Sequence, residues 1–180
     1  MKKIIIIALM AMLPLGAFSQ SLFDKYEDLD EVTSVVVNKS MFNLLSKIDV
    51  EVDDPEARDF MEIAKSVNSL KVFTTEDKSV GSDMKASVEK YLKSASLVEL
   101  MRVKDKETNI KFYIKSGQDD DHVSELLMFI TGMKDIEADG RKFETVLLSL
   151  TGNIDLNKIN SLTKKMNLPE ELNKAGKKKN

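Results

Sequence analysis

The residues best suited to chemistry in this chain form a short acidic cluster beside its single histidine. Asp119, Asp120 and Asp121 directly precede His122. Carboxylate oxygens bind hard cations such as calcium, and an imidazole nitrogen binds transition metals, so the cluster is a candidate metal site. Adjacent side chains on an extended chain point in opposite directions, however, and consecutive like charges usually stay hydrated. The sequence therefore favours a solvated loop, and we expect no cofactor.

A second acidic segment imitates the first half of a calcium-binding loop. Its carboxylates and glycine are Asp135, Glu137, Asp139 and Gly140. The twelfth position of such a loop requires a bidentate glutamate, but Val146 stands there, and the flanking segments have strand patterns rather than helical ones. The pair Asp139 and Gly140 is also a strong signal for a hairpin turn. A plain turn is therefore favoured over a metal site.

Groups for other catalytic mechanisms are scarce. The chain has no cysteine and one histidine, which excludes disulfides, thiol catalysis and metal sites with several histidines from one chain. The carboxylate pairs Glu27 with Asp28 and Asp30 with Glu31 lie in an acidic segment that we expect to be exposed, where nothing would separate their pKa values. No serine or threonine lies in a nucleophile-elbow pattern. We expect a protein without enzymatic activity.

The charge balance argues against nucleic acid as a partner. The chain has 180 residues, with 27 lysines and arginines against 30 aspartates and glutamates. Removal of a leader that contains Lys2 and Lys3 changes the net charge from −3 to −5, whereas nucleic-acid binders carry a basic excess. The lysines near the C-terminus would provide at most weak contact with anionic lipid. We favour the alternative, in which they belong to a solvated tail without a lipid partner. These lysines are Lys174, Lys177, Lys178 and Lys179.

The N-terminal residues have the form of a secretory signal peptide. Two lysines precede an apolar run from Ile4 to Leu15, and the small residues Ala17 and Ser19 occupy the positions before the expected cleavage site. The run is shorter than the roughly 20 residues that cross a bilayer, and Pro14 interrupts it. We therefore expect export to the periplasm, or alternatively to the outside of the cell, with no transmembrane segment once the leader is removed.

The chain is expected to divide into three parts. Residues 1–19 are the expected signal peptide, residues 20–168 a single α+β domain, and residues 169–180 a flexible basic tail. A mature chain of this length is sufficient for one hydrophobic core.

Apolar spacing predicts helices and strands in the first half of the mature chain. Helical spacing marks residues 22–32, 39–48, 55–67 and 84–92, and β-branched or apolar runs mark residues 33–38 and 70–75. The residue pair Asp53 and Asp54 precedes Pro55, a pattern typical of a capped helix start. Ser82, or alternatively Ser79, is the expected cap of the following helix.

From Leu97 the apolar period changes to two, which marks the passage from helices to a sheet. Two hairpins are expected, pairing residues 97–104 with 109–115 and residues 124–133 with 142–152. A last helix would begin after Asp155 and end before Pro169. The expected fold class is α+β: an antiparallel sheet, made of a four-strand meander plus one or two N-terminal strands, with helices packed on one face.

Three segments carry a recognisable pattern: residues 91–115, 124–132 and 143–162. Together, behind a secretory leader, they resemble an exported bacterial family, the domain of unknown function 4252. The resemblance covers essentially the whole mature chain. It implies a Gram-negative envelope protein with no established activity, cofactor or catalytic residue. Gene neighbourhoods with extracytoplasmic sigma factors imply a link to envelope sensing. Some members carry a lipoprotein cysteine, which this chain lacks, so a lipid anchor does not follow.

The clearest part of the resemblance has a structural explanation. It comprises Thr151, Gly152, Asn153 and Asp155. Gly152 lets the backbone leave a strand, and Asp155 can accept hydrogen bonds from the first amides of a helix. We therefore assign no chemistry to these residues.

The predicted strands carry more apolar residues than a sheet with one buried face requires. The surplus set is Val98, Leu100, Leu126, Met128, Ile130, Val146, Leu148 and Leu150. A helix, a second copy of the chain or a partner must cover this area. We expect a non-enzymatic binding module that uses this face to contact an unknown envelope protein or itself. The alternative is a periplasmic carrier that encloses a small apolar or lipid-like ligand between helices and sheet.

Overall fold

The structure is a computed structural model that describes residues 22–45, 47, 55–133, 137–138 and 141–156. The expected signal peptide, the last helix and the basic tail lie outside these residues. So do Asp53 and Asp54, which were expected to precede a helix, and the turn residues Asp135, Asp139 and Gly140.

Twelve elements follow one another along the described chain. They are η2 (Asp24–Tyr26), β1 (Val32–Asn38), α2 (Lys39–Leu45), α3 (Pro55–Ser66), β2 (Val67–Thr75), α4 (Lys78–Ala95), β3 (Val98–Asp105), β4 (Thr108–Ser116), β5 (His122–Thr131), β6 (Glu137–Ala138), β7 (Arg141–Lys142) and β8 (Thr145–Asp155).

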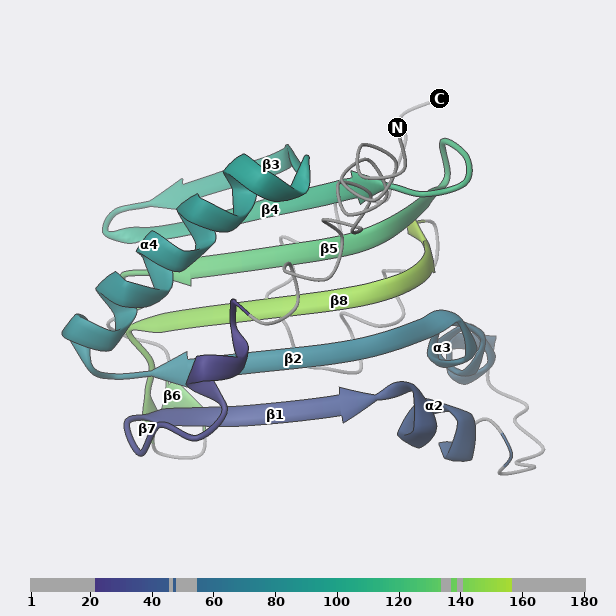
Figure 1. Cartoon of the computed structure of the whole chain (residues 1–180), viewed down its shortest axis with the longest axis horizontal. Coiled ribbons are helices and arrows are strands. Elements are labelled where there is room, and N and C mark those ends of the chain that lie inside the picture. The colour runs from purple at the N-terminus through teal and green to yellow at the C-terminus, as the bar shows by residue number, and fades with distance from the viewer. Residues whose placement is uncertain (1–21, 46, 48–54, 134–136, 139–140, 157–180) are drawn as a thin grey trace, which may run out of the picture.

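Six of the strands form one open sheet in the order β1-β2-β8-β5-β4-β3 (Figure 1). Every neighbouring pair is antiparallel. Strands β3, β4, β5 and β8 form the predicted meander, and β2 and β1 extend it at the β8 side. The short strands β6 and β7 pair with each other in a separate two-stranded ribbon. This ribbon belongs to the stretch of chain that connects β5 to β8. The α+β class and the antiparallel sheet are confirmed.

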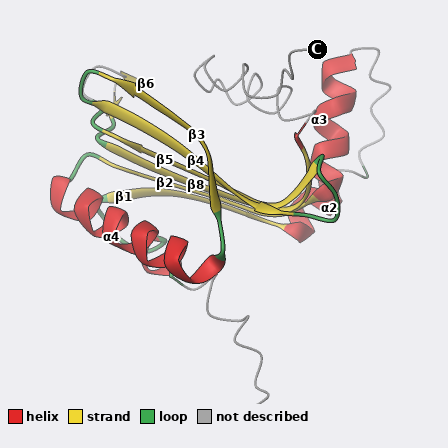
Figure 2. Ribbon diagram, turned by 90° about the horizontal axis from the view of Figure 1, so that it is seen from above, coloured by secondary structure: helices red, strands yellow, loops and turns green. Residues whose placement is uncertain are grey.

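Helices cover both faces of this sheet, whereas the sequence pattern had indicated one. On the face that we call the α4 face, Leu127 and Leu147 pack against residues of α4 and of the segment around η2. On the opposite face, which we call the α3 face, Met128 and Leu148 share a core with residues of α2 and α3. Figure 2 shows α4 below the sheet and α3 at its other end, rising on the upper side. Strands β5 and β8 are apolar on both sides because both sides are buried.

Two helix boundaries differ from the sequence expectation. The residues 22–32 form only one short turn, η2, before β1 begins at Val32. Helix α4 is capped by Asp77 rather than by Ser82 or Ser79, since its carboxylate accepts hydrogen bonds from the amides of Ser79 and Val80 at 2.7 and 2.9 Å. An aspartate placed directly before a helix satisfies two of the four amides that lack a partner at its first turn.

Helix α2 also presents a different side to the core. Met41 and Leu44 belong to the apolar spacing that predicts a helix over residues 39–48, but these side chains are 47% and 59% exposed, and Phe42 is buried instead. Phe42 therefore sets which side of α2 faces the core, as buried aromatic rings contribute strongly to packing. No helix in the described part of the chain has both the length and the apolar character needed to cross a membrane.

Candidate functional site

The predicted metal cluster forms a local pair at the start of β5. The Oδ1 atom of Asp119 lies 2.7 Å from Nδ1 of His122 and accepts a hydrogen bond from the amide of Asp121 at 3.0 Å. The hydrogen bond between the side chains raises the pKa of His122 and lowers the pKa of Asp119. Among the described residues, no three Asp, Glu, His or Cys side chains are arranged to hold a metal ion.

The expected interaction face is largely internal, which corrects the sequence interpretation. Leu126, Met128, Ile130, Leu148 and Leu150 are at most 9% exposed and belong to the core on the α3 face. Val146 is partly buried against the same core. The chain itself therefore covers the area that had indicated a partner. Val98 and Leu100, on β3, are the members of the set that stay exposed.

Exposed apolar side chains lie on both outer strands of the sheet, two on each. The outer strands are β1 and β3. Strand β1 contains no charged residue and no proline. Its Val35 and Val36 are 49% and 45% exposed, and because they are consecutive they point to opposite faces. An outer strand with these properties offers unpaired backbone groups to another strand.

Strand β3, at the other edge, has features that discourage such pairing. Its register shifts between Glu99 and Met101, as in a β-bulge. The guanidinium of Arg102 donates hydrogen bonds to both carboxylate oxygens of Glu99, at 3.0 and 2.7 Å. Lys104 and Asp105 add two further charges. Bulges and charged side chains are common protections of an edge strand, so β1 is the unprotected edge.

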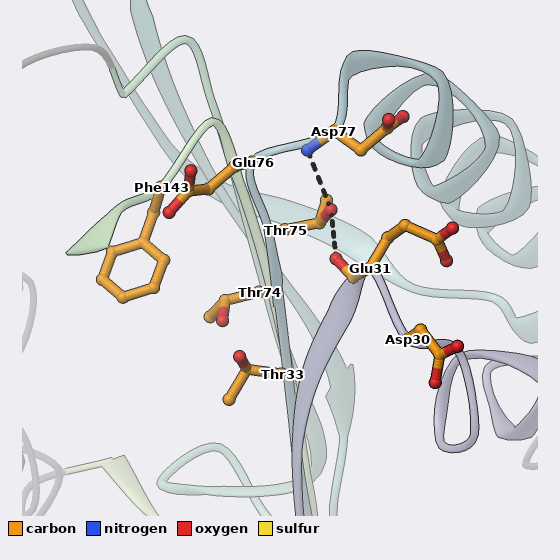
Figure 3. Close-up of a pocket in the computed structure, with 8 residues that line it drawn as sticks. All are labelled: Asp30, Glu31, Thr33, Thr74, Thr75, Glu76, Asp77 and Phe143. Atoms are coloured by element: carbon orange, nitrogen blue, oxygen red, sulfur yellow. Dashed lines mark hydrogen bonds between the residues drawn. The ribbon is translucent and has the colours of Figure 1, made fainter.

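A hollow with a volume of about 450 Å³ lies where β1 begins (Figure 3). It is lined by Asp30, Glu31, Thr33, Thr74, Thr75, Glu76, Asp77 and Phe143. Figure 3 shows the side chains of Asp30, Glu31 and Asp77 on one side of the β1 ribbon and that of Glu76 on the other. Asp77 is occupied as the cap of α4.

Thr75 connects the beginning of β1 to the beginning of α4. Its hydroxyl donates a hydrogen bond to the carbonyl oxygen of Glu31 at 2.7 Å and accepts one from the amide of Asp77 at 3.1 Å, as Figure 3 shows. Thr75 is 2% exposed. The first residues of β1 are therefore held in place before any partner binds. Nothing in the sequence pattern distinguished this threonine from its neighbours.

A buried polar site that sequence reasoning missed lies on the α4 face. The hydroxyl of Tyr91 lies 2.9 Å from Oε1 and 2.8 Å from Oε2 of Glu125, and Glu125 is 6% exposed. Beside them is a cavity of about 40 Å³, large enough for one or two water molecules. Thr151 Oγ1, which faces this region, is buried and has no hydrogen-bond partner among the described residues. In the sequence, the feature that could have indicated this site was Glu125, a charged residue within the apolar run of β5.

Glu125 is predicted to make stability depend on pH. Burial raises its pKa, an effect that outweighs the opposing hydrogen bond from Tyr91. The folded chain then binds the proton more tightly than the unfolded chain, so the free energy of unfolding falls as pH rises from the unfolded to the folded pKa. Glu125→Gln removes this loss. In urea unfolding, the free energy of unfolding of the variant should rise relative to that of the natural chain as the pH increases above the unfolded carboxyl pKa of about 4.

Tyr91→Phe provides the matched comparison for this experiment. Because the Tyr91 hydroxyl lowers the pKa of Glu125, its removal should make the pH-dependent loss of stability larger and extend it to higher pH, while the loss still begins near the unfolded pKa. If the difference in free energy of unfolding between the natural chain and Glu125→Gln stayed constant over the whole pH range, this role of the buried carboxyl would be contradicted.

The segment around η2 is attached to the α4 face by ion pairs. Lys71 of β2 binds Asp24 and Glu27, the latter at 2.7 Å, and Lys25 binds Asp83 of α4. Burial opposes the charge on Lys71, but the hydrogen bonds with Asp24 and Glu27 outweigh it and raise the pKa of Lys71. The pairs at Asp24 and Lys25 are about half exposed, so each adds at most about 1 kcal/mol. Their effect is to position the residues that lead into β1.

These features define a small α+β protein with an open antiparallel sheet and one unprotected edge. Residues 26–162 match the model of the family described as "Domain of unknown function (DUF4252)", and the chain belongs to this family. No curated protein and no solved structure matches the chain.

Proposed function

We propose that this chain is an exported, non-enzymatic binding protein of the periplasm that contacts a polypeptide partner through β1. The observation that carries the proposal is the uncharged outer strand with half-exposed Val35 and Val36. An added strand would bind the free backbone groups of β1, and it would cover both valines. Export is supported by the signal-peptide pattern of residues 1–19.

The polar groups that could take part in catalysis have structural partners within the fold. Asp119 and His122 bind each other, Asp77 caps a helix, and Glu125 is buried against Tyr91.

A carrier of apolar ligands has less support from the described hollows. The hollow of about 450 Å³ is lined mainly by carboxylates and threonines, and the cavity of about 40 Å³ is too small for a lipid chain. A third hollow, of about 200 Å³ between α4 and the sheet, is smaller than most ligand pockets and includes the charged Lys85, Glu89 and Lys111 in its lining.

Photocrosslinking in intact cells tests the proposal. A photoreactive benzoylphenylalanine is placed at Val36 on β1 or, as the matched control, at Lys104 on β3. Both are exposed or half-exposed positions of an outer strand. Irradiation should produce a discrete adduct with a polypeptide from the Val36 position and none from Lys104. Equal adducts from both positions, or none from Val36, would contradict β1 as the contact strand.

A further inference from the structure

We propose that the strand bound by β1 is β1 of a second copy, paired antiparallel about a two-fold axis at Val35. The inference rests on the proposed function, because it takes β1 as the contact strand, and it adds the identity of the partner. Two copies joined in this way would share one continuous sheet, with the α4 faces on the same side. In such an interface each residue faces the residue that is equally far from the axis on the other copy.

The middle of β1 is compatible with itself in this register. Val35 faces Val35 of the second copy, and Ser34 faces Val36. All of these side chains are uncharged. A strand with charged residues would often place like charges opposite each other when it pairs with itself, and β1 avoids this repulsion. The pairing places the two half-exposed valines of each copy against apolar or small neighbours.

The charges at the two ends of β1 complement each other. Glu31 precedes the strand and Lys39 follows it, and each is four positions from Val35. Glu31 directly precedes β1 and Lys39 is the first residue of α2, so the antiparallel register places the Glu31 end of each strand beside the Lys39 end of the other, twice per dimer. Both residues are exposed, and Thr75 holds the backbone of Glu31 in place.

Exposed apolar side chains also flank the two ends of β1. Leu29, in the segment before the strand, is 39% exposed, and Met41, in α2 after it, is 47% exposed. Five of the seven large apolar side chains that are exposed among the described residues lie between residues 29 and 44: Leu29, Val35, Val36, Met41 and Leu44. The pairing would cover Val35 and Val36 directly, and it would bring the segments that flank β1 in the two copies near each other.

A single cysteine at the proposed axis tests the register. The chain has no natural cysteine, so one introduced thiol can pair only with its counterpart on a second copy. Opposite residues of antiparallel strands have Cα atoms about 4.5–5.5 Å apart, within the range that a disulfide spans. Under mild oxidation Val35→Cys should form a disulfide-linked dimer, and Val98→Cys, at an exposed position of β3, should not. Equal yields from both variants would overturn the proposed register.

Charge exchange tests the end contacts without adding a cysteine. In sedimentation of the purified chain, Glu31→Lys should weaken the dimer about tenfold, because two ion pairs become repulsive contacts. Adding Lys39→Glu to the same chain should restore most of the affinity. Glu76→Lys, a charge change at a neighbouring exposed position outside β1, is the control and should leave the affinity unchanged.

The outcomes separate this inference from the proposed function. A natural chain that stays monomeric up to about 100 µM, while Val36 crosslinks to a different polypeptide, would overturn self-pairing and leave β1 as the contact strand. A dimer that withstands Glu31→Lys and yields no disulfide with Val35→Cys would also overturn it. A monomer with no adduct from Val36 would overturn both.

Discussion

Gly152→Ala is expected to lower the free energy of unfolding by on the order of 3 kcal/mol. Gly152 has a φ of 155°, a value that L side chains rarely adopt. A Cβ atom at this position would lie 2.3 Å from the carbonyl oxygen of Ser66 and 2.8 Å from Cα of Val67. Both contacts are with backbone, so no side chain can move aside, and β2 would have to separate from β8.

The matched control for this experiment is Asn153→Ala, at the next residue along β8. Asn153 is exposed, so its replacement should change the free energy of unfolding by no more than about 0.5 kcal/mol. Urea unfolding followed by circular dichroism measures both variants. Equal stability of Gly152→Ala and Asn153→Ala would contradict the close approach of β2 and β8.

Tyr26→Ala should lower the free energy of unfolding by about 3–5 kcal/mol, as replacement of other large buried aromatic side chains by alanine does. Tyr26 is 0% exposed and packs against Phe73, with ring centroids 5.9 Å apart. Its hydroxyl lies 2.7 Å from Asp83 Oδ2 and 2.8 Å from Ser87 Oγ, both on α4. Loss of this ring removes the main apolar contact that fixes the segment before β1.

Tyr26→Phe separates the ring from the hydroxyl. Because only the two hydrogen bonds are lost, the cost should be about 1–2 kcal/mol. Thermal or urea unfolding at one pH measures both Tyr26 variants. If Tyr26→Ala were as mild as Tyr26→Phe, the residues around η2 would not be part of the core, and the start of β1 would lack its support.

Local patterns predicted the order of helices and strands well because each is set by neighbours in the sequence. The alternation of Ile110, Phe112 and Ile114 marked β4, and Pro55 marked the first residue of α3. The positions of helices relative to the sheet were harder. The apolar residues of β5 and β8 could equally well face a partner or a second layer of the same chain, and only the three-dimensional structure decides between these alternatives.

The candidate sites were less predictable because they depend on residues that are distant in sequence. Tyr91 and Glu125 are 34 positions apart, and Tyr91 had been assigned to an ordinary apolar stripe. The unprotected edge was also hidden, since strand order determines which of the predicted strands lies outermost. The face of α2 was predicted wrongly because helical spacing alone did not show that Phe42, rather than Met41 and Leu44, would enter the core on the α3 face.

Amide hydrogen exchange tests the central claim, that β1 binds another strand through its backbone, most directly. The experiment compares two samples. One is the unbound chain at low concentration, and the other is the chain in complex with the polypeptide that the Val36 crosslink captures, which can be a second copy. We predict slower exchange along residues 32–38 in the complex, with no change along residues 98–105 of β3. Slower exchange at β3, or on the meander, while β1 exchanges as fast as before, would contradict the claim.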